Sequence, residues 1–302
     1  MSVILTLDSH RTSVSTPSLK TAELENLLNY LKRVHQIDLT GYKRPSLMRR
    51  TLVRMQQVGV EHYQDYLDRL QQQPEELAHF LDTVFINFSY FFRDRPVWDY
   101  LANQIVPQII ANKEPNEPIR VWSAGCASGE ETYSLAMLLA EALGVEQFQQ
   151  RVQLYGTDVD RDAVMQARKG YYSAQAVKTI PAALREQYFE RKPDGYLWRT
   201  DLRRSMIFDC RDLIQSPPLP RIDLLVCRNT LIYFQQEAQI RALVRFHFSL
   251  RNNGFLVLGQ AEKLVAHPQS SLFTPVAQQV SVYTKVPDAH RHPRLLAIAF
   301  CS

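Results

Sequence analysis

The sequence lacks the features that would place the chain in or across a membrane. No apolar stretch among its 302 residues approaches the roughly 20 residues needed to cross a bilayer. The apolar segment at residues 3–7 is too short for the core of a signal peptide, and no small-residue cleavage site follows it. We therefore expect a cytoplasmic protein with no targeting segment and no membrane insertion.

Cysteine and histidine do not occur at the spacings that indicate metal binding or nucleophilic catalysis. The four cysteines (Cys126, Cys210, Cys227 and Cys301) form no CxxC pair, which predicts a reducing compartment and no zinc knuckle. The eight histidines show no metal-ligand spacing, and no Ser-His-Asp or Cys-His constellation emerges. These absences argue against the common hydrolase triads and predict no bound metal.

What remains is an ordinary soluble composition, 45% apolar and 22% charged, with no internal repeat. The net charge of +4 is unevenly distributed along the chain. The window 31–60 holds seven basic residues and one acid, Asp38, so its net charge of +6 exceeds that of the whole chain. This basic window favours docking to an acidic partner, although a solvated helix face would have the same composition.

The first part of the chain has a helical pattern. A Ser/Thr-rich lead at 1–20 is expected to be flexible, and residues 21–84 carry apolar residues at helical spacing, which predicts an all-α N-terminal domain. Ser46 is expected to cap one of its helices, and another begins at Pro74. The expected apolar stripe of the first of these helices is Met48, Leu52 and Met55, with Arg50 and Arg54 on another face.

The pattern then changes to alternating strands and helices. A junction at 85–118, with a helix at 97–111, leads into this region at 119–286, and residues 287–302 form a tail without assigned role. Buried apolar strands alternating with helices predict an α/β fold with a doubly wound, mainly parallel Rossmann-like sheet. Strands are expected at 119–124, 152–157, 205–209, 222–227 and 254–258, helices at 130–143, 161–168 and 237–250, a helix plus hairpin insertion at 171–204, and an antiparallel strand at 279–285 at the sheet's end.

A glycine-bearing turn, Ala-Gly-Cys-Ala-Ser-Gly-Glu-Glu at 124–131, joins the first strand to its helix. Doubly wound folds receive nucleotides at this turn, so Gly125 is a candidate cofactor-binding position. Glu130 and Glu131 lie where a pyrophosphate would otherwise bind and would repel it. They would tolerate a cationic ligand without phosphate, such as S-adenosylmethionine. Ser128 and Glu131 also fit a simple capping box, which explains neither glycine.

Polar residues follow two strands at the end that faces the crevice. Asp158 ends the second strand and is the candidate ribose ligand, whereas Asp160 is expected to cap the next helix. Arg228 and Asn229 directly follow the fourth strand and are better site residues than core residues. No Asn/Asp-Pro-Pro-Tyr sequence stands there, as methylases of base amino groups would carry, which weakens a nucleic-acid interpretation.

The junction sequence Phe-Ile-Asn-Phe-Ser-Tyr-Phe-Phe-Arg-Asp at 85–94 can lie across the top of this crevice. Its aromatics would usually be core residues, but Asn87, Ser89 and Arg93 are polar interruptions that need partners. An arginine among aromatics is costly unless it serves a ligand or an acid. Arg93 is therefore either a ligand-facing residue or half of a structural ion pair, for example with Asp94.

At these residues the chain resembles the CheR-type chemotaxis receptor methyltransferases. The resemblance covers about residues 22–286 and rests on linked motifs in the family's order. These motifs are GYKRPSLMRRTLVRM, NFSYFFRD, WSAGCASGEETYSLAM, YGTDVD, CRNTLIYF and the late GFLVLGQAEKL. The resemblance implies transfer of a methyl group from S-adenosylmethionine to glutamate side chains of receptor cytoplasmic domains, giving methyl esters and S-adenosylhomocysteine.

The resemblance also assigns roles to individual residues. Arg93 and Tyr233 match positions near the transferring methyl, and the insertion matches a small β-subdomain that binds a receptor's C-terminal peptide in some members. The protein is expected to be a monomer recruited to membrane receptor arrays. The implied cofactor positions are Asn87, Ser89, Arg93, Glu131, Asp158, Asp212, Leu213, Arg228 and Asn229, and the implied receptor-docking residues are Lys43, Arg49, Arg50 and Arg54.

Four positions depart from the family pattern without removing a group that the chemistry requires. Ser89 stands for threonine, Asp212 for asparagine, Thr132 for proline and Gln260 for histidine. A glutamate carboxylate is ionised at neutral pH, with a reference pKa of about 4.3, so no general base is needed. Two alternatives stay open: an RNA or small-molecule methyltransferase using the basic window as a phosphate patch, and a signalling scaffold with a vestigial cofactor pocket.

Overall fold

The structure is a computed structural model that describes residues 17–262, 264, 270–287 and 293–300. Its described residues fall into two compact units. One comprises residues 17–40 and 44–84, and the other comprises residues 41–43 together with the described residues from 85 onward. The expected flexible lead lies largely outside the described residues, and the first helix already begins at Pro17.

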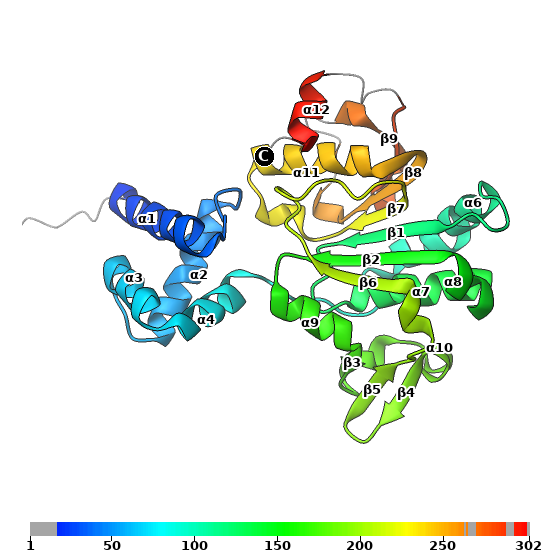
Figure 1. Ribbon diagram of the computed structural model, residues 1–302, viewed down its shortest axis with the longest axis horizontal. Coiled ribbons are helices and arrows are strands. Elements are labelled where there is room, and N and C mark those ends of the chain that lie inside the picture. The colour runs from blue at the N-terminus through cyan, green and yellow to red at the C-terminus, as the bar shows by residue number, and fades with distance from the viewer. Residues whose placement is uncertain (1–16, 263, 265–269, 288–292, 301–302) are drawn as a thin grey trace, which may run out of the picture. The chain divides into compact units, whose positions relative to one another are not determined.

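The first unit is entirely helical, as expected (Figure 1). It consists of α1 (Pro17–His35), α2 (Arg44–Gln57), α3 (Tyr63–Gln72) and α4 (Pro74–Val84). The leucines of α1 at helical spacing are fully buried because they form one face of that helix. These leucines are Leu24, Leu27, Leu28 and Leu31.

The predicted apolar stripe of α2 is confirmed at Met55 and wrong at Met48 and Leu52. The helix begins at Arg44 rather than after Ser46, and its buried positions are Leu47, Thr51 and Met55. Leu52, predicted to be in the stripe, is 37% exposed. The reason is that a polar residue occupies the core face: the Thr51 hydroxyl donates to the Leu47 carbonyl at 2.9 Å, which removes the cost of its burial.

The second unit is built on a seven-stranded sheet, which confirms the predicted fold class. The strand order is β6-β2-β1-β7-β8-β10-β9, in which the first five strands run parallel and β10 is antiparallel to both its neighbours. The predicted final strand is thus antiparallel, but β9 lies outside it at the sheet edge. The strands are β1 (Ile119–Ala124), β2 (Val152–Asp158), β6 (Met206–Cys210), β7 (Ile222–Cys227), β8 (Leu250–Leu258), β9 (Phe273–Ala277) and β10 (Val282–Lys285).

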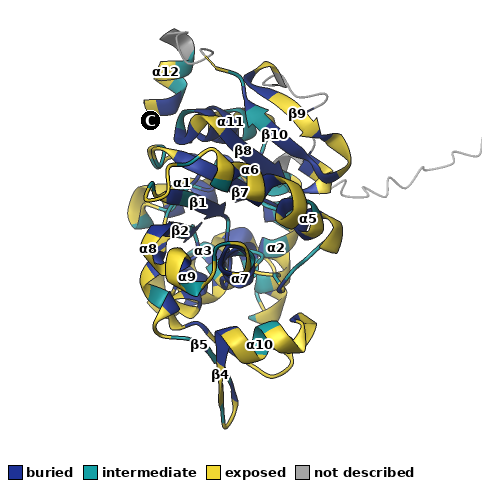
Figure 2. Cartoon of the chain, turned by 90° about the vertical axis from the view of Figure 1, so that its right-hand side faces the viewer, coloured by how far each residue is buried: buried dark blue, intermediate teal, exposed yellow. Residues whose placement is uncertain are grey.

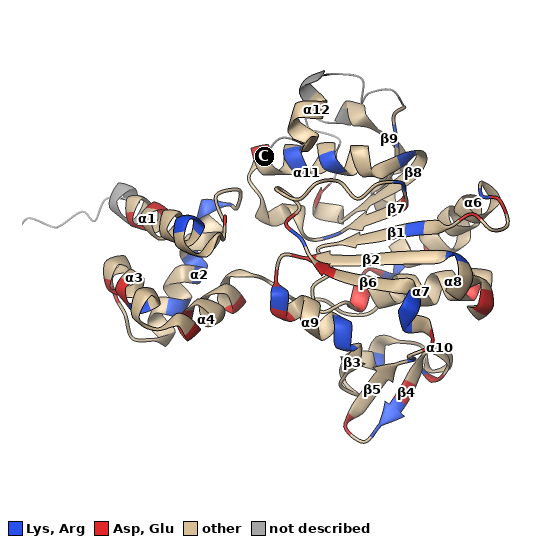
Figure 3. Cartoon of the chain, viewed as in Figure 1, with Lys and Arg blue, Asp and Glu red and all other residues tan. Residues whose placement is uncertain are grey.

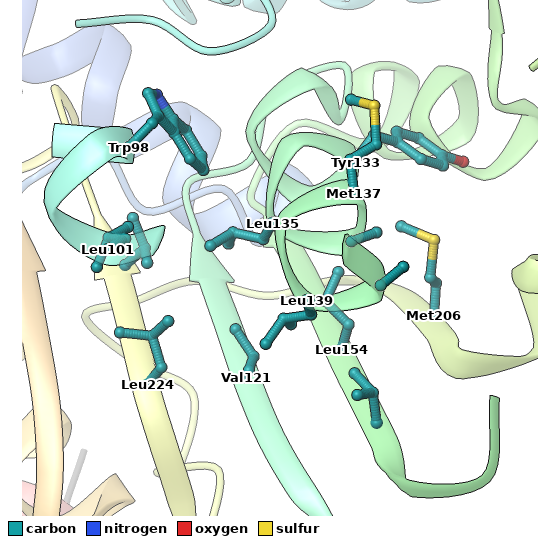
Figure 4. Packing of buried hydrophobic residues seen from close by; sticks show 14 of the residues in the cluster. Trp98, Leu101, Val121, Tyr133, Leu135, Met137, Leu139, Leu154, Met206 and Leu224 are labelled. Atoms are coloured by element: carbon teal, nitrogen blue, oxygen red, sulfur yellow. The ribbon is translucent and has the colours of Figure 1, made fainter. Parts of the chain in front are cut away.

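Helices cover both faces of this sheet because successive side chains of a strand point to opposite faces. Val121 and Leu224 pack with α7 on one face, whereas Trp122 and Leu225 pack with α11 on the other. Figure 4 shows the first of these clusters, and Figure 2 shows that the central strands β1 and β7 are buried. The helices are α5 (Arg95–Tyr100), α6 (Val106–Ala111), α7 (Glu130–Leu143), α8 (Val145–Arg151), α9 (Arg161–Lys169), α11 (Gln236–Ser249) and α12 (Pro293–Phe300).

Two segments differ in detail from the sequence prediction. The helix expected at 97–111 is a continuous helical run whose middle, Leu101–Ile105, is π-helical. The insertion is a helix and hairpin as predicted, α10 (Ala182–Tyr188), β4 (Phe189–Lys192) and β5 (Gly195–Trp198), and a third strand, β3 (Tyr171–Tyr172), pairs with β5. Short 3-10 turns occur at Ala176–Thr179, Leu202–Ser205, Leu231–Tyr233, Gln260–Glu262, Ser270–Leu272 and Gln278–Val280.

Candidate active site

The glycine turn between β1 and α7 lies at the carboxyl ends of the strands, where the strand order reverses. The Gly125 and Cys126 amides both donate to the Thr157 carbonyl at the end of β2, at 2.8 and 3.0 Å. Gly125 has φ +77°, and a Cβ there would lie 2.2 Å from the Thr230 hydroxyl oxygen. Only glycine fits this position, because another residue would clash with the segment that follows β7.

Asp158 ends β2 as predicted and holds the turn in place. Its Oδ2 accepts from the Ala127 amide at 2.8 Å, and its Oδ1 accepts from the Asp160 amide at 3.0 Å. Burial raises the pKa of this carboxyl. A carboxylate has about four acceptor sites, so this group keeps capacity for a further donor, which suits a ribose diol. The neighbouring Asp160 caps α9 as predicted, accepting from the amides of Asp162 and Ala163.

The two glutamates at the start of α7 do not form the alternative capping box. The N-cap is Gly129, which has no side chain to cap with, and the Ser128 hydroxyl donates instead to Glu130 at 2.8 Å. The Ser123 hydroxyl donates to Glu131 at 2.9 Å. Burial raises the pKa of both carboxyls. An anionic phosphate would be repelled here, whereas a ligand that brings a positive charge would stabilise the ionised carboxylates.

The junction segment runs along this part of the crevice. The Asn87 amide nitrogen donates to Asp160 Oδ2 at 2.6 Å, and the Ser89 side chain hydrogen-bonds Glu130. Further along, the Phe92 amide donates to the Ser134 hydroxyl of α7 at 3.0 Å. Three contacts therefore tie the segment to the end of β2 and the first turns of α7. Binding of cofactor by Asn87 and Ser89 stays a prediction.

Arg228 connects the end of the junction segment, at Arg93 and Asp94, to Glu131 at the start of α7. Its side chain is only 2% exposed; Nη2 donates to Asp94 Oδ2 at 2.6 Å and to the Arg93 carbonyl at 2.9 Å, and Nη1 donates to Glu131 at 3.4 Å. The guanidinium also lies 5.8 Å from the Trp98 ring centroid. Protein groups already occupy this arginine, and its cofactor contact stays a prediction.

Arg93, by contrast, makes no ion pair within the described part of the chain. The alternative of a pair with Asp94 is wrong, because the Asp94 carboxylate binds Arg228. The Arg93 guanidinium lies near the rings of Phe88 and Tyr90 and donates to the Phe88 carbonyl at 3.3 Å. The Arg93 carbonyl accepts from Arg228, which binds Glu131, so a cation without an ion pair among the described residues lies in the segment that adjoins the start of α7.

Glu262 is a site residue that the sequence analysis missed. Its carboxylate accepts from the amides of Gly259, Asn229 and Thr230 at 2.8 Å each, and from Ile232 at 3.2 Å. Burial raises its pKa even though these amides lower it. Asn229 has φ +58°, so Glu262 stabilises a strained turn that leads to the candidate catalytic Tyr233. The only sequence signal was its place in the late family motif.

A second missed residue is Tyr42, in the short segment 41–43 that belongs to the sheet unit. The Lys43 amide donates to the Tyr233 carbonyl at 2.9 Å, and the Tyr42 ring meets Phe234 edge-on at 5.0 Å. Burial and the carboxylates of Asp212 and Asp158 raise the pKa of the Tyr42 hydroxyl far above its usual value. Tyr42 therefore lies within electrostatic reach of two predicted cofactor residues.

The remaining predicted cofactor residues lie just after β6. The Asp212 carboxylate accepts from the amides of Ile214 and Gln215 at 2.6 and 3.2 Å and so stabilises the turn that follows it. Leu213 is 8% exposed and belongs to the apolar cluster beneath α11. Their contacts with a cofactor stay predictions.

The predicted docking residues fall into two groups. Figure 3 shows in blue the Lys and Arg positions of the helical unit. Arg54 forms a two-pronged pair with Glu76, at 2.8 and 2.7 Å, and Arg50 donates to the Thr83 carbonyl at 2.7 Å. Lys43 and Arg49 are exposed. Arg50 and Arg54 therefore have partners within the helical unit, and receptor docking by any of these four residues stays a prediction.

The strand order and the glycine turn are typical of doubly wound folds that bind a nucleotide-derived cofactor. The buried carboxylates favour a cationic cofactor, as in the S-adenosylmethionine-dependent methyltransferases. Residues 87–280 match the family described as "CheR methyltransferase, SAM binding domain", and residues 22–85 match "CheR methyltransferase, all-alpha domain". The chain belongs to the CheR methyltransferase family and is an S-adenosylmethionine-dependent methyltransferase.

Individual relatives agree with this assignment. A chemotaxis protein methyltransferase of Listeria innocua is 32% identical over 235 residues, covering 78% of this chain and 87% of the relative. One of Borreliella burgdorferi is 27% identical over 250 residues, covering 80% and 88%. An uncharacterized 104.1 kDa protein of Rhodobacter capsulatus is 33% identical over 261 residues, covering 86% of this chain but only 27% of that protein. This chain therefore spans about a quarter of that longer relative.

Among solved structures, a TehB-like SAM-dependent methyltransferase from Corynebacterium glutamicum superposes with a TM-score of 0.34 at 16% identity, covering 64% of this chain and 96% of that chain. This likeness is too distant to bear on function. In the part of the chain that the structure describes, no helix is both long and apolar enough to span a bilayer. Over the same residues, His, Cys, Asp and Glu form no group of three suited to a metal.

Proposed function

We propose that this protein transfers the methyl group of S-adenosylmethionine to glutamate side-chain carboxylates of chemotaxis receptors. The observation that carries the proposal is the Arg93 guanidinium, which forms no ion pair among the described residues although its own carbonyl accepts from Arg228, the partner of Glu131. An acceptor that is itself a carboxylate would complement Arg93, whereas an RNA acceptor would face the carboxylates of Glu131 and Asp158. The names of the relatives from Listeria innocua and Borreliella burgdorferi point the same way.

The residues of the crevice fit the cofactor. In this proposal Asp158 accepts from the ribose diol, and the Gly125 turn lets the backbone approach the cofactor closely. The carboxylates of Glu130 and Glu131 favour a positive charge and disfavour phosphate. S-adenosylmethionine supplies an electrophilic methyl group on a positively charged sulfur.

Transfer requires no general base in this scheme. A glutamate carboxylate oxygen attacks the methyl carbon as the carbon–sulfur bond breaks, and the bonding electron pair stays on sulfur, so a neutral ester and a neutral thioether result. No proton moves. The role of Arg93 is to orient the acceptor carboxylate, because full neutralisation would weaken it as a nucleophile. Tyr233 shapes the path of the methyl group or donates a hydrogen bond to the acceptor.

Docking to the receptor forms a second part of the proposal. The exposed face of α2 carries Arg49 together with Leu52 and Val53, which are 37% and 44% exposed. A basic and partly apolar helix face suits an acidic amphipathic helix, the expected form of a receptor's cytoplasmic domain. Through this contact the protein would be recruited to membrane receptor arrays. Arg50 and Arg54 support the helix rather than contact the partner.

The docking face is tested by charge reversal with a matched control. Arg49→Glu should lower methylation of an intact receptor domain at low salt and leave cofactor affinity unchanged. Arg33→Glu makes the same charge change on the exposed surface of α1 and should have little effect. Equal losses in both variants would mean that only net charge matters, and no loss in either would remove α2 from docking.

The substrate itself is tested by tritium transfer from labelled S-adenosylmethionine to purified receptor cytoplasmic domains. The expected result is incorporation into the receptor, released as a volatile product by mild base, as a carboxyl methyl ester requires. Replacement of the acceptor glutamates by alanine should abolish incorporation. Label that appears only on RNA, or label on protein that resists base, would overturn the proposal.

A further inference from the structure

Aromatic rings, rather than an acid of the described residues, lie next to the Arg93 guanidinium. The Cζ of Arg93 lies 5.7 Å from the centroid of the Phe88 ring and 5.7 Å from the centroid of the Tyr90 ring. The two rings meet edge-on, with centroids 5.9 Å apart. Among the described residues, the guanidinium donates one hydrogen bond, to the Phe88 carbonyl at 3.3 Å, which is long for such a bond.

Burial does not explain why aromatic residues stand here. Phe88 is 69% exposed and Tyr90 is 37% exposed, whereas Phe91 in the same segment is 1% exposed and belongs to the core. A ring as exposed as Phe88 gains little from the hydrophobic effect. The Phe88 ring instead lies near the Arg93 cation and meets the Tyr90 ring edge-on.

The second arginine of the crevice provides the contrast. Arg228 is buried, and the carboxylates of Asp94 and Glu131 neutralise it. One arginine is therefore buried and paired with two acids, whereas the other lies next to two rings and has no ion pair among the described residues. Since a ring face attracts a cation without accepting its N–H groups in the plane of the guanidinium, those groups stay available.

We propose that Phe88 and Tyr90 are positioning residues that hold the Arg93 guanidinium in place without neutralising it, leaving its N–H groups for the acceptor carboxylate. This inference rests on the proposed function, since it assumes an anionic acceptor. An acid in place of the rings would position Arg93 equally well but would compete with the acceptor for the same donors. Rings in place of an acid are therefore an advantage when the acceptor is itself a carboxylate, because they leave the Arg93 donors free.

A double-mutant cycle tests whether the rings act through Arg93. Phe88→Leu keeps an apolar side chain but removes the ring face, and should lower kcat/KM for the acceptor about fivefold while the cofactor Kd is unchanged. Phe88→Trp should restore activity, because it restores the ring. In an Arg93→Ala background, Phe88→Leu should cause no further loss. Equal losses in both backgrounds, or full activity of the leucine variant, would overturn the proposal.

A spectroscopic measurement tests the clamp without any acceptor. In a protein labelled with ¹⁵N, the Arg93 side-chain resonance should carry a ring-current shift that Phe88→Leu reduces and Phe88→Trp retains. Phe300→Leu is the matched control, since Phe300 is an aromatic residue of α12 with 60% exposure, and it should leave the resonance in place. An unmoved resonance in Phe88→Leu would refute the clamp, whereas missing ester formation by the wild type would refute the receptor substrate instead.

Discussion

At the scale of single residues, Asp158 is the most direct test of the cofactor site. Asp158→Ala should weaken S-adenosylmethionine binding by about 1.5–3 kcal/mol, the range for a hydrogen bond to a charged group. Asp158→Asn should retain part of this, because the amide oxygen can still accept from the Ala127 amide. Calorimetry gives the affinity and thermal unfolding the stability. Unchanged affinity in the alanine variant would contradict the assignment.

Substitution of Arg93 distinguishes a catalytic role of this residue from a structural one. Arg93→Ala should lower turnover by at least about 10²-fold, as lost positioning contacts do, and leave the melting temperature near normal, because no ion pair is broken. Lysine should rescue little, since it lacks the planar fork that binds a carboxylate with two bonds. A lowered melting temperature with normal turnover would make Arg93 structural. Full activity with lysine would reduce its role to charge.

Glu262 should matter for both folding and turnover. Glu262→Ala leaves the amides of Asn229, Thr230 and Ile232 without their acceptor and frees the turn before Tyr233. We expect a loss of roughly 2–4 kcal/mol in the free energy of unfolding, as for buried groups left without partners, and a fall in kcat in the folded fraction. Glu262→Gln should lie between the alanine variant and the wild type. Denaturant titration and assays of folded protein measure the two effects, and normal kcat would limit Glu262 to a structural role.

At the scale of elements, the pair between Arg54 of α2 and Glu76 of α4 holds the helical unit together. The Glu76 side chain is 3% exposed and also accepts from the Tyr66 hydroxyl at 2.9 Å. Arg54→Ala should destabilise this unit by roughly 3–5 kcal/mol, because it leaves a buried carboxylate without its cation. Arg49→Ala, on the exposed face, should change stability by less than about 0.5 kcal/mol. Similar melting temperatures for the two variants would contradict the structural role of Arg54.

The same pair predicts acid sensitivity of the helical unit. Burial alone would raise the pKa of Glu76, but hydrogen bonds from Arg54 and Tyr66 lower it below its usual value. A carboxyl whose pKa is lower in the folded state stabilises the fold above its unfolded pKa, and this contribution is lost as the pH falls through the folded value. In an acid titration followed by circular dichroism, the helical signal should be lost at a higher pH in Glu76→Gln than in the wild type. The reason is that the variant lacks this contribution to stability at every pH.

At the scale of the whole molecule, the crevice carboxyls predict a pH-dependent coupling between stability and cofactor. Burial raises the pKa of Glu131 and Asp158, so their contribution to the ligand-free fold is present at low pH and is lost as the pH rises through their folded values. A cationic cofactor favours the ionised carboxylates. Its stabilisation of the protein should therefore be larger near pH 7 than near pH 5. Thermal shifts with and without S-adenosylmethionine measure this, and a pH-independent shift would contradict it.

The local sequence determined most of the elements of this protein. Strand β1 and helix α7 coincide with the predicted 119–124 and 130–143, and strand β7 coincides with 222–227. These elements follow from spacings of two to four residues, which a chain carries in its local sequence. The glycine turn and Asp158 were found for the same reason, since a doubly wound fold places them at fixed points along the chain.

Only the tertiary structure decided which polar groups satisfy one another. Arg228 meets Asp94 from 134 residues away and Glu131 from 97, and Glu262 reaches Asn229 across 33. No periodicity in the sequence specifies such partners, because they depend on which strand ends the sheet order brings together. Packing likewise decided that Arg54 binds Glu76 and that Thr51, not Leu52, is buried in α2. It also decided that β9 lies outside β10. Local spacing determines which face of an element is apolar, and packing then determines which charges form ion pairs and which, like Arg93, form none among the described residues.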